Sequence, residues 1–158
     1  MADKQAVGRK VSPVTMLEGR ASFAHIDGVA IVLTNVAKWT DEDVLRMVKK
    51  QAELVGYVSA HGNVTHFFGE VFGATHRKML VDWITESGFE PSSRTAMVTD
   101  SKLMRAAMTA YAWLTKTEAK AFEPGDHKAL CEWVVRGTPA NPTEVQAALE
   151  DCYKLLGK

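Results

Sequence analysis

The segment HFFGEVFGATHRK has the residue types of a metal site or a switch, because it holds two histidines and a carboxylate within eleven residues. His66 and Glu70 are four residues apart, the spacing that brings two ligands together on one face of a helix. Gly69 and Gly73 disfavour a helix there, and His76 lies beyond them. The tighter zinc pattern His-Glu-x-x-His is absent. We therefore expect no metal in this segment and no cofactor elsewhere.

Other catalytic and nucleotide-binding patterns are also missing from the sequence. Neither Cys131 nor Cys152 is placed at a strand-to-helix turn, and there is no Gly-x-Ser-x-Gly elbow. The glycines of FGEVFG lack the Lys-Ser/Thr pair of a phosphate loop. An enzyme that uses Asp100 with one of the five histidines stays open, although no motif indicates it. We expect a protein without catalytic activity.

The triplet Thr99-Asp100-Ser101 is a candidate ligand edge. It follows a predicted strand and precedes a predicted helix, at the carboxyl edge where open α/β sheets bind ligands. Asp and Ser are also favoured N-cap residues, so helix capping is the alternative interpretation.

Composition limits the classes of partner. The chain has 158 residues, the size of one domain, and its 19 Lys and Arg balance its 19 Asp and Glu. Without a basic field, nucleic acid is disfavoured as a partner. No apolar stretch is long enough for a membrane span or a leader, and two cysteines are too few for a disulfide framework. We expect a soluble cytoplasmic protein whose cysteines are small apolar helix residues.

Periodicity and turn residues predict an α/β fold with a mixed, mostly parallel sheet opened by a β-hairpin and helices packed on it. Residues 1–18 lack periodicity and are interpreted as a flexible arm. The expected strands are residues 21–26, 29–36, 57–61, 95–99 and 118–123. Asp27-Gly28 suits the hairpin turn, and Gly62-Asn63 also indicates a turn. One expected helix spans residues 75–87, and the others follow Thr40, Asp100 or Ser101, Pro124 and Asn141.

Each expected helix has a predicted buried face. In the helix of residues 75–87 this face is Met79, Leu80, Trp83 and Ile84. In the next helix it is Leu103, Met104, Ala107, Met108, Tyr111 and Leu114, and in the following one Ala129, Leu130, Trp133 and Val134. Residues 138–158 form a linker and a terminal amphipathic helix with Val145, Leu149, Cys152 and Leu156 on one face. That face packs on its own sheet, the favoured reading, or on a second subunit or partner.

The stretches TAMVTDS, KLMRAAMTAYAWL, EAKAFEP and HKALCEWV together resemble the STAS-like, SpoIIAA-like family of anti-sigma-factor antagonist fold. The resemblance covers residues 19–137 and implies a bacterial regulatory domain that binds another protein. The family's phosphoacceptor serine, which follows an aspartate, would fall near Phe68 and Gly69, where no Asp-Ser pair exists. The phosphoacceptor is therefore absent, and Thr75 is the nearest hydroxyl at a helix start, where a capping role is favoured.

Two functions follow as hypotheses. The first is a non-catalytic regulatory or protein-interaction module that binds its partner through Phe67, Phe68, Gly69, Glu70 and Thr75. The second is a small lipophilic-ligand binder, because STAS-like folds are similar to lipid-carrier domains and the predicted helix layer is rich in Met and aromatic residues. Both leave homo-oligomerisation open.

Overall fold

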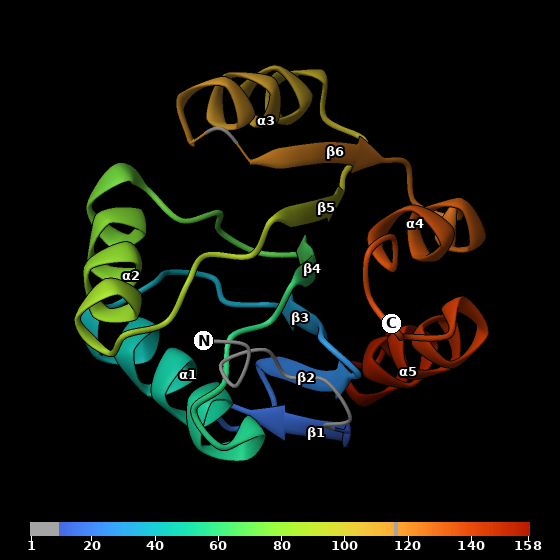
Figure 1. Ribbon diagram of the computed structural model, residues 1–158. Helices are drawn as coiled ribbons and strands as arrows, with labels where there is room; N and C mark the ends of the chain where they lie inside the picture. The colour runs from blue at the N-terminus through green and yellow to red at the C-terminus, as the bar shows by residue number, and fades with distance from the viewer. Residues whose placement is uncertain (1–9, 116) are drawn as a thin grey trace.

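A mixed β-sheet forms the centre of the computed structural model, which describes residues 10–115 and 117–158. In the described residues six strands lie in sequence order across the sheet: β1 (Lys10–Met16), β2 (Ala21–Ile26), β3 (Val29–Thr34), β4 (Gly62–Phe67), β5 (Arg94–Val98) and β6 (Glu118–Phe122). The first three strands are antiparallel, and β3 to β6 are parallel (Figure 1). The predicted α/β fold with a mixed sheet opened by a hairpin is confirmed.

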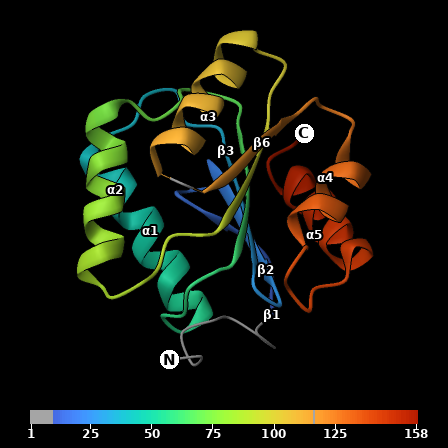
Figure 2. The ribbon, with the colours of Figure 1, turned by 45° about the horizontal axis from the view of Figure 1, so that its top comes forward.

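The helices cover both faces of this sheet. On one face lie α1 (Asp41–Val55) and α2 (Ala74–Glu86), and α3 (Lys102–Thr115) packs beside β6. On the other face lie α4 (His127–Val134) and α5 (Pro142–Leu155), side by side across the sheet from α1 and α2 (Figure 2). None of the helices within the described ranges is long and apolar enough to cross a membrane.

Local sequence signals position the hairpin and the first helix as predicted. Asp27 and Gly28 both have positive φ, 46° and 98°, as the tight turn between β2 and β3 requires. The Thr40 side chain accepts a hydrogen bond from the Asp43 backbone N–H at 3.1 Å and caps α1. Gly56 ends the helix in the left-handed conformation.

Two predictions about the strands are wrong. Residues 10–16 of the expected flexible arm form the edge strand β1, and residues 1–9 lie outside the described residues. Pro13 and a bulge between Val11 and Val14 interrupt its alternation, and an edge strand tolerates both. The strand predicted at 57–61 lies instead at 62–67. Gly62 is not a turn residue: a Cβ there would lie 2.9 Å from the Val134 carbonyl oxygen.

Four predictions about helix residues are also wrong. Leu103 and Ala107 are predicted to be buried, but Leu103 is 79% exposed and Ala107 is exposed as well. Ala129 is exposed, and Cys131 takes its place in the core. Thr75 does not cap α2, because the N-cap is Gly73 and Thr75 lies inside the helix. The side chains of residues 111 and 114 lie outside the described set.

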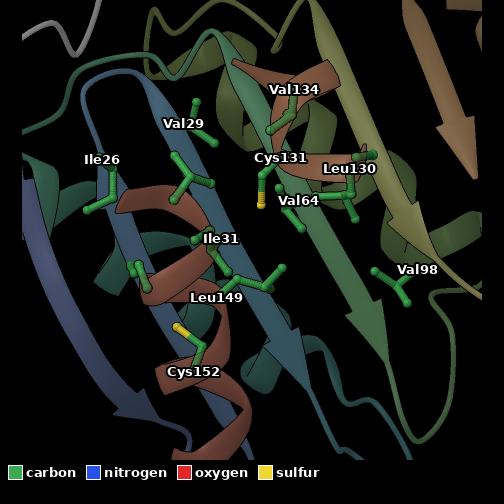
Figure 3. Close-up of a cluster of buried hydrophobic side chains, with 14 of the residues drawn as sticks. Ile26, Val29, Ile31, Val64, Val98, Leu130, Cys131, Val134, Leu149 and Cys152 are labelled. Atoms are coloured by element: carbon green, nitrogen blue, oxygen red, sulfur yellow. The ribbon is translucent and has the colours of Figure 1, made fainter. Parts of the chain in front are cut away.

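The C-terminal helix packs on its own sheet, as favoured from its apolar face. Val145, Leu149 and Cys152 are fully buried, and α5 contacts β1, β2 and β3. Figure 3 shows Leu149 and Cys152 facing the side chains of β2, β3 and β4. Asn141 accepts a hydrogen bond from Thr143 N at 2.8 Å and caps the helix before its first-turn proline. This face of the sheet is therefore covered by closely packed side chains.

Candidate ligand-binding cavity

The opposite face of the sheet holds a partly open cavity of about 640 Å³ between the strands and the helices α1, α2 and α3. Its volume lies within the range of small-molecule binding pockets. None of the residues of α2 is fully buried, although the predicted inward residues Leu80, Trp83 and Ile84 all line the cavity. The helix layer on this face therefore stands over a hollow.

Strand alternation supplies the floor of the cavity. Successive side chains of a strand point to opposite faces, so every second residue of β2 to β5 faces α1 to α3. The strand register places these floor side chains in three rows: His25, Ala30, Asn63 and Thr95; Phe23, Val32, Thr65 and Met97; and Thr34 beside Phe67. Ala30 and Thr34 are four residues apart, which corresponds to about 13 Å along the strand.

The walls of the cavity are mainly aliphatic, aromatic and thioether side chains. They come from three helices and from the loops after α1 and α2, and include Met47, Val48, Val55, Leu80, Ile84, Phe89, Met104 and Met108. Methionine is flexible and polarizable, and adapts to irregular apolar ligands. The cavity thus offers an apolar interior with hydrogen-bonding groups on its floor.

Thr34 is one of the most deeply buried polar residues on this floor. It is 1% exposed, and its Oγ1 atom has no hydrogen-bond partner among the described residues. Buried hydroxyl groups are almost always paired, because an unpaired one loses its hydrogen bonds to water without replacement. This hydroxyl lines the cavity and can both donate and accept a hydrogen bond.

Fully charged side chains line the cavity only at exposed positions. Among the described lining residues, the Arg and Glu side chains are Arg77 and Glu90, and both residues are exposed. Arg77 Nη1 donates a hydrogen bond to the Phe72 carbonyl at 2.8 Å. The Glu90 backbone N–H donates to Ser59 Oγ at 2.9 Å, which joins the loop after α2 to the loop after α1. The interior has no Lys, Arg, Asp or Glu among the described lining residues.

The two aromatic residues predicted to bind a partner, Phe67 and Phe68, lie on opposite faces of the sheet. Phe67 lines the cavity and meets the ring of Phe72 edge-on at 5.2 Å. Phe68 lies on the other face of the sheet, stacked on His66 at 4.0 Å and edge-on to Tyr153 at 5.7 Å. The structure therefore does not bring these two rings together in one contact surface.

The other predicted partner residues belong to a connection between β4 and the segment before α1. A Cβ at Gly69 would clash with the Val36 carbonyl oxygen, so only glycine fits this contact. The Trp39 backbone N–H donates to Glu70 Oε2 at 2.7 Å, and Trp39 Nε1 donates to the Glu70 carbonyl at 2.8 Å. Glu70 and Thr75 also line a separate hollow of about 310 Å³.

The two histidines of the segment HFFGEVFGATHRK lie on different faces of the sheet. His66 Nδ1 lies 2.7 Å from the Tyr153 hydroxyl of α5. Burial, followed by the proximity of His127, lowers the pKa of His66 from 6.5 to about 4. His76 Nε2 instead lies 3.0 Å from Asp41 at the start of α1. Across the part of the chain that the structure describes, no three His, Cys, Asp or Glu side chains are grouped to hold a metal.

The triplet at the end of β5 forms a cap in the structure. Thr99 Oγ1 accepts a hydrogen bond from Ser101 N at 3.1 Å, and Ser101 Oγ accepts one from Met104 N at 3.3 Å. Neither Thr99, Asp100 nor Ser101 lines the cavity. His25 is the histidine in the described lining, and Asp100 is not among the lining residues.

The cavity floor is not among the predictions made from the sequence. The pattern that could have indicated it is a set of polar residues at inward positions of otherwise apolar strands: His25, Thr34, Asn63, Thr65 and Thr95. In a filled core such positions carry aliphatic side chains.

Comparisons with known proteins name a fold. No family model matches the chain, and no curated protein matches it significantly. Among solved structures, the chain is similar to an uncharacterized DUF3478-family protein with a SpoIIAA-like fold from Shewanella loihica. The two share 13% identity with a TM-score of 0.49, over 80% of this chain and 92% of that one. This is the same fold that the sequence resemblance names, and the similarity concerns the fold alone.

Proposed function

We propose that this protein is a non-catalytic binding protein that holds a small lipophilic molecule between its sheet and the helices α1 to α3. The observation that carries the proposal is the apolar cavity of about 640 Å³ on this face. Protein interiors are normally packed without voids, and the α4/α5 face of this sheet follows that rule. A ligand that fills the hollow would restore the missing contacts.

A fluorescence titration with N-phenyl-1-naphthylamine, an uncharged apolar probe, tests the proposal. We expect saturable binding at one site per chain, together with a rise in melting temperature that grows with probe concentration. Ala107→Phe introduces a ring on the side of α3 that lines the cavity. Ala106→Phe is the matched control, because Ala106 is exposed and does not line the cavity.

The proposal requires that Ala107→Phe weakens probe binding at least several-fold and that Ala106→Phe leaves it unchanged. Equal affinity of both variants, or the absence of saturable binding to the unaltered protein, would contradict it. Native mass spectrometry of freshly purified protein adds a direct readout. A reproducible extra mass that organic extraction removes identifies a co-purified ligand.

A protein-interaction role is the second candidate, and exposed apolar side chains on α3 favour it. Leu103 is 79% exposed and Trp113 is 84% exposed on the helix that closes one side of the cavity. Large apolar side chains that a helix leaves exposed are candidates for contact with a partner. Co-purification of a stoichiometric protein that is lost in a Trp113→Ser variant, and retained in Phe68→Ala, would support this role. Retention in both variants would contradict it.

A further inference from the structure

We infer that the ligand of the cavity is an uncharged lipophilic molecule with a hydrogen-bonding group, such as a hydroxyl or a carbonyl, that pairs with Thr34 Oγ1. This inference rests on the proposed function and specifies the chemical class of the ligand. Its starting point is the 1% exposed hydroxyl that lines the cavity and has no partner among the described residues.

The position of Thr34 explains why the partner should come from a ligand. Thr34 ends β3, where its backbone carbonyl accepts a hydrogen bond from Phe68 N at 2.8 Å. Its register partner on β4 is Phe67. The Phe67 ring has no nitrogen or oxygen atom that could form a hydrogen bond with the Thr34 hydroxyl. The Thr34 side chain is 1% exposed and belongs to the lining of the hollow. A group of the ligand at this end of the floor can therefore satisfy it.

The charge of the lining indicates an uncharged ligand. A carboxylate or an ammonium group loses its hydration on burial and needs a counter-charge or several hydrogen bonds in return. Among the described lining residues, Arg77 and Glu90 carry full charges, and both are exposed at the edge of the cavity. Beside Thr34 the floor offers the half-buried Phe67, and the adjacent row holds the buried residue Thr65. Neutral hydrogen-bonding groups match this environment.

Three probes of one ring system separate the possibilities: naphthalene, 2-naphthol and 2-naphthoate. Each is measured by its displacement of N-phenyl-1-naphthylamine from the unaltered protein at pH 7. We expect 2-naphthol to bind about three- to tenfold tighter than naphthalene, the gain of one net hydrogen bond. We expect 2-naphthoate to bind weakest of the three.

Variants at one position identify the partner atom. Thr34→Val keeps the shape of the side chain and removes the hydroxyl, so it should abolish the preference for 2-naphthol while naphthalene binds as before. Thr34→Ser keeps a hydroxyl and should keep the preference. Thr85→Val, at an exposed position outside the cavity, is the control. Circular dichroism of each variant checks that the fold is retained.

Three results would overturn the inference while leaving the proposed function intact, provided that the fluorescent probe still binds. The first is a preference for 2-naphthol that is unchanged in Thr34→Val. The second is an equal loss of affinity for all three probes in that variant. The third is tighter binding of 2-naphthoate than of the other two probes. Failure of the fluorescent probe to bind the unaltered protein would instead remove the proposed function itself.

Discussion

Removal of the Thr34 hydroxyl should stabilise the ligand-free protein. Most substitutions in a protein interior are destabilising, so a gain in stability is an unusual and specific expectation. Thr34→Val replaces a hydroxyl by a methyl group of similar size. The hydroxyl is 1% exposed and unpaired among the described residues, and the neighbouring side chain Phe67 is apolar.

The expected gain can be worked out from this environment. A buried polar group without a partner costs about 1–3 kcal/mol relative to a paired one. The cavity next to Thr34 is partly open, so we expect the lower half of that range, about 1–2 kcal/mol. For a chain of this length each kcal/mol raises the melting temperature by about 2–4 °C, which gives an increase of about 2–8 °C. Valine is also well suited to a strand.

Urea unfolding of ligand-stripped protein, followed by circular dichroism, measures the free energy of unfolding. The midpoint should rise with no change in the slope against urea, since the exposed surface is unaltered. Thr85→Val, on the exposed side of α2, should change the free energy by less than about 0.5 kcal/mol. A neutral or destabilising effect of Thr34→Val would show that the hydroxyl has a partner in the free protein, and the reasoning about the ligand would fail with it.

Three further predictions concern the packing around the cavity and the opposite face. Burial holds the pKa of His66 at about 4 in the folded protein, below its usual 6.5, so the unfolded chain binds more protons between these values. The free energy of unfolding should therefore fall, by at most about 1.4 kcal/mol per pH unit, as the pH drops through this window. His66→Phe should remove that slope in urea titrations at several pH values, and an identical slope would contradict the assignment. Leu149→Ala in α5 empties a fully buried position and should cost about 2–5 kcal/mol, whereas Leu155→Ala, 42% exposed, should cost about 0.5 kcal/mol. Equal urea midpoints for these two variants would show that α5 is not docked on the sheet. Gly69→Ala places a Cβ against the Val36 carbonyl oxygen and should destabilise the protein by about 1–3 kcal/mol or more. In Gly73→Ala the Cβ meets no atom within 4 Å, so this control should cost less than about 1 kcal/mol. A smaller loss of stability in Gly69→Ala than in Gly73→Ala would contradict the close contact.

Elements with strong local signals could be predicted from the sequence. The Asp27-Gly28 turn, the Thr40 cap and the Asn141 cap each act through their own backbone neighbourhood, so residue type alone indicates them. The α5 face was predictable for a similar reason. Its apolar residues recur at helical spacing, and a short linker returns the helix to its own sheet.

The remaining elements depend on contacts between distant parts of the chain. Gly62 indicates a turn by its type, but its position in β4 is required by the Val134 backbone. β1 contains Pro13, and its edge position makes that residue tolerable. The cavity could not be predicted at all from periodicity. The apolar residues of α2, such as Leu80 and Ile84, recur at helical spacing. This spacing is the same whether the helix covers a cavity or a packed core.

Methyl NMR of the methionines tests the central claim, the binding of a lipophilic molecule in the cavity, most directly. Met47, Met97, Met104 and Met108 line the cavity, whereas Met16 and Met79 do not. With methyl-labelled methionine, titration with N-phenyl-1-naphthylamine should shift the signals of the four lining residues together. The signals of Met16 and Met79 should stay in place. Shifts confined to those two residues, or no shifts at a probe concentration that saturates fluorescence, would contradict the claim.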